Sequence, residues 1–217
     1  VVNNGGVQFV HDFAAANDAE VNSGGAQWVE DNASANGTTL NGGAQYLIGF
    51  GSASDTIVNS GGVQSVAASA TASNTTINNG GTQLDYGLTT NATVSGGTQV
   101  VESGGTASGT IVSNGGTLEL LGGATASGYT ISPGGTLEIA SGYTLSGYTV
   151  DSATTLDIAN GGSVSNTTLD SGGTLNVLSG GTASGLTIND PNDPNFTALA
   201  TVLSGGAVNG TTSLMGG

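Results

Sequence analysis

A pair of glycines returns along almost the whole chain, at an interval that is mostly 19 residues. GGTLE at residues 115–119 is repeated at 134–138, and only two intervals depart from the period, at 18 and 16 residues. The pair, or its replacement, starts at Gly5, Gly24, Gly42, Gly61, Gly80, Gly96, Gly115, Gly134, Ala153 and Gly172. A period near 20 residues without helix formers is typical of β-solenoids. The repeat therefore predicts stacked coils, one coil to each repeat.

Within each repeat, two runs of alternating apolar and polar residues are separated by glycine-containing corners. We expect an all-β fold, a right-handed single-stranded parallel β-helix over residues 1–217, in which each strand pairs with its equivalents in the coils above and below. Eleven or so coils at about 4.8 Å each would make a rod of roughly 50 Å. The first residues, VVNNGGVQ, already match later repeats, which indicates a segment of something longer.

The stretch NDPNDPNF, residues 189–196, interrupts the repeat. Its two prolines cannot donate hydrogen bonds to a β-ladder, so we predict a loop insertion here. Both a tolerated insertion and a binding loop fit this pattern.

Stacking of equal coils predicts columns of like residues. Leu118, Leu137, Leu156 and Leu175 form one inward column, and Leu120, Ile139, Ile158 and Val177 form another two places on. In the first half, the position of Leu118 is taken by Gln8, Gln27, Gln45, Gln64, Gln83 and Gln99, which predicts a buried amide ladder unless that strand faces water. One column holds only Gly, Asn or Asp and predicts a left-handed corner: Asp18, Gly37, Asp55, Asn74, Asn91, Gly109, Gly128, Gly147, Asn166, Gly185 and Gly210.

The charge of the chain restricts its partners. It contains no Lys, Arg or Cys, and 15 acidic residues give it a formal charge of −15. Without cationic side chains it cannot neutralise phosphates, so nucleic acid is a very poor partner and an anionic membrane surface is nearly as poor. A disulfide scaffold is excluded, and no stretch is apolar enough to span a bilayer. Partners are expected to be neutral, cationic or bridged by metal ions.

The outward position between the two inward columns changes character along the chain. Phe9, Trp28 and Tyr46 begin it, and we interpret them as a candidate binding strip for a partner rod, a sugar or a neighbouring domain, although aromatic residues also simply suit strands. Glu119, Glu138 and Asp157 follow later, as stacked acids that either solvent screens or a divalent cation bridges. No calcium-binding loop motif is present, so neither a cofactor nor a metal site is assigned, and indifference of stability to chelators would dismiss the cation.

Catalysis finds little support in the sequence. The acid pair Glu119 and Glu138 lies in a periodic ladder without a cleft signal, and His11 has no second His or Cys beside it. A recurring Thr before the strand aliphatic residue is compatible with an ice-binding solenoid, but a second Thr two places along is missing. We therefore predict a protein that is not an enzyme.

The phrases VNSGGVQSV, SGGTQVVESGGTASGTIVSNGG and SGGTLNVLSGGTASGLTI resemble the passenger repeats of self-associating autotransporter adhesins, the family of the adhesin involved in diffuse adherence. The resemblance covers nearly the whole chain except residues 189–196, although a complete lack of Lys and Arg is unusual for such repeats. It implies an extracellular β-helical stalk on the bacterial cell surface, exported through a C-terminal barrel and active in cell aggregation, biofilm formation or attachment to a host receptor or glycan.

The resemblance also implies O-glycosylation of repeat Ser and Thr residues by a dedicated glycosyltransferase. Candidate positions are Thr130, Thr149, Thr168, Thr187, Ser108, Ser127 and Ser184. Three rival functions stay open from the residues alone: a self-polymerising filament subunit, an ice-binding solenoid and a carbohydrate-active β-helix.

Overall fold

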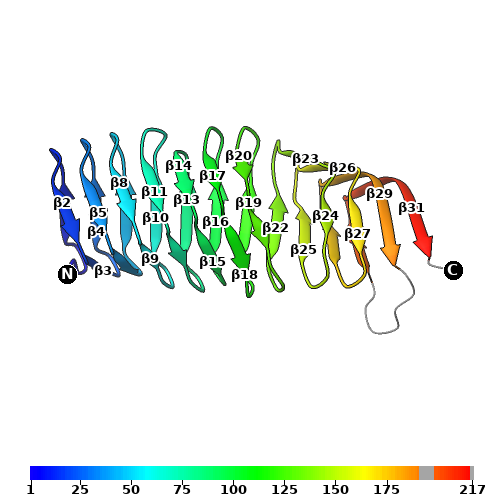
Figure 1. Ribbon diagram of the computed structural model, residues 1–217, viewed down its shortest axis with the longest axis horizontal. Helices are drawn as coiled ribbons and strands as arrows, with labels where there is room; N and C mark the ends of the chain where they lie inside the picture. The colour runs from blue at the N-terminus through cyan, green and yellow to red at the C-terminus, as the bar shows by residue number, and fades with distance from the viewer. Residues whose placement is uncertain (191–197, 216–217) are drawn as a thin grey trace.

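The computed structural model describes residues 1–190 and 198–215. Most of the predicted loop at 189–196 lies outside these residues. The described chain is a parallel β-solenoid without helices, whose coils stack along one axis and place the termini at opposite ends (Figure 1). The expected all-β parallel solenoid is therefore confirmed.

One sheet, which we call the spine sheet, runs the full length of the rod. It contains eleven parallel strands, one from each coil, and we number the coils by them. These strands are β1 (Val7–Val10), β4 (Ala26–Val29), β7 (Ala44–Leu47), β10 (Val63–Val66), β13 (Thr82–Asp85), β16 (Thr98–Val101), β19 (Thr117–Leu120), β22 (Thr136–Ile139), β25 (Thr155–Ile158), β28 (Thr174–Val177) and β30 (Leu199–Val202).

Two further faces complete coils 1–7, so each coil has three short strands where the alternation predicted two runs. The second sheet holds β2 (Ala15–Asn17), β5 (Ser34–Asn36), β8 (Ser52–Ser54), β11 (Thr71–Ser73), β14 (Leu88–Thr90), β17 (Thr106–Ser108) and β20 (Thr125–Ser127). The third sheet holds β3 (Glu20–Asn22), β6 (Thr39–Asn41), β9 (Ile57–Val58), β12 (Thr76–Ile77), β15 (Thr93–Ser95), β18 (Ile111–Ser113) and β21 (Thr130–Ile131).

Neither of these two sheets continues into coil 8. A separate sheet begins there and holds β23 (Thr144–Ser146), β24 (Thr149–Val150), β26 (Ser163–Ser165), β27 (Thr168–Asp170), β29 (Thr182–Asp190) and β31 (Ala207–Met215). The expectation that every strand pairs with its equivalent above and below is therefore wrong between coils 7 and 8.

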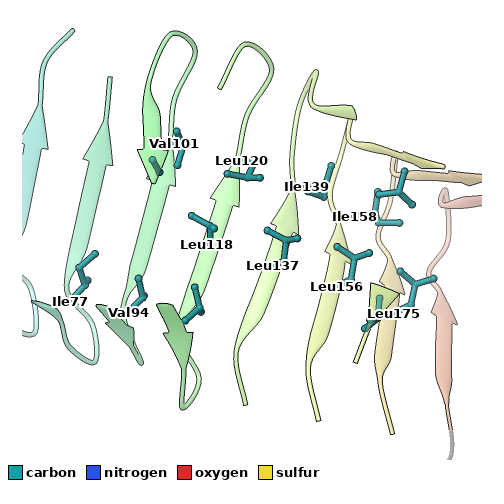
Figure 2. Close-up of a cluster of buried hydrophobic side chains, with 14 of the residues drawn as sticks. Ile77, Val94, Val101, Leu118, Leu120, Leu137, Ile139, Leu156, Ile158 and Leu175 are labelled. Carbon is teal, nitrogen blue, oxygen red and sulfur yellow. The ribbon is translucent and has the colours of Figure 1, made fainter. Parts of the chain in front are cut away.

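The predicted inward columns form the core. Leu118 pairs in register with Leu137, and Leu137 pairs with Leu156, so leucines stack on leucines in this part of the spine sheet. Their side chains are fully buried, and Figure 2 shows Leu118, Leu137, Leu156 and Leu175 in one row beside Leu120, Ile139 and Ile158. Burial of these side chains is worth about 1.5–3 kcal/mol each.

The predicted left-handed corner is also confirmed. Every member of the column from Asp18 to Gly210 has a positive φ, between 51° at Asn166 and 71° at Gly109. This explains the restriction to Gly, Asn and Asp, since other residues pay about 1–2 kcal/mol in this conformation. The corner chemistry and the strand pattern thus specify the same coil.

The glutamines at the Leu118 position form the predicted buried ladder in the first five coils. Nε2 of Gln45 donates to Oε1 of Gln27 at 2.6 Å, and Nε2 of Gln64 donates to Oε1 of Gln45 at 2.7 Å. The third face adds hydroxyl donors to the same oxygens, such as Oγ1 of Thr75 to Oε1 of Gln64 at 3.0 Å. The interior amides of Gln27, Gln45 and Gln64 are therefore satisfied by groups of neighbouring coils.

A second amide ladder, which the sequence analysis missed, runs along the outside at the end of the third face. Asn59 donates to Asn41 at 2.8 Å, and Asn78 donates to Asn59 at 2.9 Å. The signal was the Asn that recurs shortly before the glycine pair in the first coils.

The buried ladder predicts that Gln64→Leu is strongly destabilising, even though Leu fills the same column in later coils. The substitution leaves the Gln83 amide and the Thr75 hydroxyl buried without their acceptor. We expect a loss of about 3 kcal/mol in the free energy of unfolding, measured by urea denaturation. Gln8→Leu is the control, because Gln8 is half-buried and makes one ladder bond. Equal losses in both variants would contradict a cooperative interior ladder.

Candidate functional site

The outward residues of the spine sheet form one column along the rod, as the repeat predicts. Phe9 pairs in register with Trp28, and Trp28 with Tyr46. Further along, Glu119 pairs with Glu138, and Glu138 with Asp157. The column therefore presents an aromatic zone at one end of the rod and an acidic zone beyond its middle.

The aromatic zone, Phe9, Trp28 and Tyr46, is a stacked platform. The rings of Trp28 and Tyr46 lie with centroids 4.5 Å apart and an interplanar angle of 29°. Phe9 is 61% exposed, while Trp28 and Tyr46 are partly covered by each other and by neighbouring strands. Stacked rings with one open face offer apolar area at a low cost in side-chain entropy, which suits a contact surface.

Two further exposed aromatic residues lie in the corners that follow the spine strands β1 and β7. Phe13 and Phe50 are 79% and 67% exposed, and both have a left-handed backbone, with φ of 63° and 66°. An exposed, bulky side chain at positive φ is uncommon and costs free energy. The sequence analysis missed both residues because it compared strand positions, whereas the signal was an aromatic residue in a turn.

The acidic zone, Glu119, Glu138 and Asp157, is half-buried and under strain from like charges. Partial burial raises the pKa of Glu138, and the carboxylates of Glu119 and Asp157 raise it further. Burial and the nearby Glu102 likewise raise the pKa of Glu119. The zone ends where Asn176 donates a hydrogen bond to Asp157 at 2.8 Å. Within residues 1–190 and 198–215, no three His, Asp or Glu side chains converge as a metal site would require.

The candidate glycosylation residues lie on the outside of the second and third faces and of their continuation beyond coil 7. Ser127, Ser184, Thr130 and Thr149 are exposed, whereas Ser108, Thr168 and Thr187 are half-buried. Ser127 stacks on Ser108 with their Oγ atoms 3.5 Å apart. The threonine column of the third face is not continuous, because Ile57 and Ile111 occupy it in two coils.

No cavity or cleft opens among the described residues that could enclose a substrate. His11, considered as a base or ligand, is an exposed corner residue whose Nδ1 lies 2.8 Å from Oδ2 of Asp12. No helix in the described part of the chain is long and apolar enough to cross a membrane. The chemistry available is therefore that of an extended surface.

One carboxyl lies inside the rod, where the sequence analysis did not place it. Asp85 occupies the inward column that holds Val66 and Val101 in the neighbouring coils and is fully buried. Its Oδ2 accepts hydrogen bonds from Oγ1 of Thr89 at 2.8 Å and from Nε2 of Gln99 at 2.7 Å. Because Gln99 turns to Asp85, it no longer donates to Gln83.

The environment of Asp85 favours its neutral form. Burial raises the pKa of Asp85 to about 7, against the two hydrogen bonds, which lower it. Oδ1 of Asp85 and Oε1 of Gln83 are both buried acceptors without a donor. Protonation of Asp85 removes the free-energy cost of burying a charge. The amide ladder therefore ends beside a group that can titrate.

Two comparisons place the chain among known proteins. Residues 41–81 match the family model described as an adhesin of the bacterial autotransporter system, probable stalk. A solved structure, described as a TibC-catalysed hyper-glycosylated fragment of TibA, is 32% identical, with a TM-score of 0.68 over 96% of this chain and 82% of that chain. No curated protein matches the chain.

Asp85 predicts that stability falls as pH rises. The carboxyl titrates near 3.8 when unfolded and near 7 when folded, so between these values only the folded state keeps the proton. The free energy of unfolding should therefore fall by about 3 kcal/mol from pH 4 to pH 7. Asp85→Asn should remove most of this slope in urea titrations and leave a smaller one of the same sign from Glu119 and Glu138.

Asp55→Asn is the matched control for this prediction, because Asp55 is an exposed corner residue in a column where Asn also occurs. It should keep the pH profile of the unmodified chain. An unchanged slope in Asp85→Asn would show that Asp85 does not titrate inside the folded rod.

Proposed function

The chain belongs to the bacterial autotransporter adhesins, and we propose that it forms part of the extracellular stalk of such an adhesin and works by surface contact without catalysis. The observation that carries the proposal is the unbroken outward column of the spine sheet, which presents zones of different chemistry along a rod whose described residues form no substrate cleft. Membership of this family supports a location on the outside of the bacterial cell, as part of an adhesin anchored in the outer membrane.

We further propose that the aromatic zone is where this rod adheres, to other copies and to host surfaces. Each copy carries a formal charge of −15 with no Lys or Arg, so two rods repel each other over most of their length. Contact between copies must gain its free energy from apolar area or from ions, and Phe9, Trp28 and Tyr46 supply stacked apolar area. Weak contacts then add up when many rods meet between two cells, in aggregates or biofilm.

Glycosylation is the second part of the proposal. The similar TibA fragment is described as hyper-glycosylated by TibC. In this chain, the exposed hydroxyls of Ser127, Ser184, Thr130 and Thr149 are open to a glycosyltransferase, while buried hydroxyls such as that of Thr75 are sealed in the interior. Sugars on these faces would leave the aromatic zone of the spine sheet uncovered.

The adhesive role predicts that the double variant Trp28→Ser, Tyr46→Ser loses self-association, because it removes the stacked rings. Beads coated with the rod should clump at physiological salt, and the variant should reduce clumping at least about fivefold, in line with hot-spot losses of 1 kcal/mol or more. Leu84→Ser with Val100→Ser is the control, since both residues occupy the same outward column. Clumping unaffected by loss of the rings would rule out the aromatic zone as the contact.

Glycosylation predicts added mass in heptose-sized steps when the chain is co-expressed with a heptosyltransferase of this family. Ser127→Ala and Thr130→Val should each remove modification at their own residue, whereas the buried Thr75 should be unmodified in every sample. Intact-mass and peptide mass spectrometry measure both. An unmodified intact mass would refute this part of the proposal and leave the adhesive part standing.

A further inference from the structure

The interruption between coils 7 and 8 affects two of the three faces, and we call it the seam. The spine sheet crosses it, since β19 pairs with β22 in full register. On the other faces, neither β20 with β23 nor β21 with β24 forms a pair. Figure 1 shows the place between the coil of β20 and that of β23.

Hydrogen bonds between coils confirm the seam. On one side, the Thr125 amide donates to the Gly105 carbonyl at 2.9 Å, and on the other the Ser163 amide donates to the Tyr143 carbonyl at 3.0 Å. The equivalent bond from Thr144 to the preceding coil is missing from the described residues, as is that from Thr149. Both corners beside the spine sheet keep their bonds, for example Gly122 to Ser141 at 2.9 Å.

The first cause of the seam is Tyr143. It occupies a corner column in which the other coils have only Ala or Gly, namely Ala14, Ala33, Gly51, Ala70, Gly87, Gly105, Ala124, Gly162, Gly181 and Gly206. A Cβ added at Gly105 or Gly162 would overlap a carbonyl oxygen of the preceding coil. Ala fits this position in four other coils, so we attribute the lost pairing of coils 7 and 8 to the ring of Tyr143 beyond its Cβ.

The second cause is a pair of tyrosines on the inward column of the third face. Thr110 and Thr167 occupy this column just before and after the seam and are buried, but Tyr129 and Tyr148 lie between them and are only half-buried. All three tyrosines pack against the hydrophobic core beside the seam. Burial raises the pKa of each, with a smaller effect of Tyr143 on Tyr129 and of Tyr129 on Tyr148.

The core is correspondingly less tightly closed at the seam. Ala126 and Leu145, on the inward column of the second face, are only half-buried, whereas Ala107 and Val164 in the adjacent coils are 1% exposed. Beneath the spine sheet the core continues, with Leu118 and Leu137 fully buried on either side (Figure 2).

We propose that the seam is a joint, at which coils 1–7 and coils 8–11 tilt relative to each other about the spine sheet. In a stacked-repeat protein each coil is held by its interfaces with its neighbours, so the weakest interface sets where the stack moves. Here one pair of strands joins the halves, while two or three pairs join other neighbouring coils. The inference does not depend on the proposed adhesive role.

The absence of Cys allows a direct test with paired spin labels. Thr106→Cys with Ser163→Cys places labels three coils apart across the seam. Ser52→Cys with Thr106→Cys places them three coils apart within the closed stack. Pulsed electron paramagnetic resonance should give a narrow distance distribution for the closed pair and a broader one for the seam pair. Equal widths would overturn the joint.

Restoring the residues of the other coils should close the joint. In the triple variant Tyr129→Thr, Tyr143→Ala, Tyr148→Thr, the distribution of the seam pair should narrow to that of the closed pair, and an unchanged width in the folded variant would overturn the assigned cause. Hydrogen exchange of the unmodified chain provides a test that does not need this variant to fold. The amides of Thr144 and Thr149 should exchange at least about tenfold faster than those of Thr125 and Thr168, and equal protection would refute the joint.

Discussion

The backbone hydrogen bond between equivalent residues of neighbouring coils is the interaction on which the whole molecule depends. It places each residue directly against the equivalent residue one repeat away, so that side chains of the same type often lie in contact. Amides benefit from this, since each glutamine can donate and accept along the interior ladder. Carboxylates suffer from it, because Glu119 and Asp157 add to the effect of partial burial in raising the pKa of Glu138. The same geometry thus stabilises one column and frustrates another.

Much of the fold could be predicted from the sequence, because residues one period apart in the sequence stack on each other in neighbouring coils. Stacked columns such as Leu118 and Leu137 follow from the period alone, and the corner from Asp18 to Gly210 follows from the few residues that accept positive φ. The contents of the candidate site were also predictable where they lie on strands, as with Trp28 and Tyr46. Which surface column makes contacts was not, because exposure alone names no partner.

The features that were not predicted are single residues that differ from the rest of their column. Their effect depends on side-chain volume or charge, which the repeat pattern does not show. Asp85 is one residue among aliphatic ones and becomes titratable only because the coil seals it. Tyr143 is one large residue in a column of Ala and Gly, and its effect depends on a backbone carbonyl of the coil before it. Phe13 and Phe50 lie in turns, where the period-two reading does not apply. The effect of each of these residues depends on how the coils pack in three dimensions.

The seam also has a mechanical meaning for a rod that connects two surfaces. A pull along the axis loads the bonds between coils in series, whereas the faces of one coil share that load in parallel. Between most neighbouring coils three pairs of strands bear this load together. Between coils 7 and 8 the pairing of β19 with β22, of four residues each, is the one strand pair that bears it. Tension therefore concentrates at this one interface, so a stretched rod yields first at the position that three tyrosines determine.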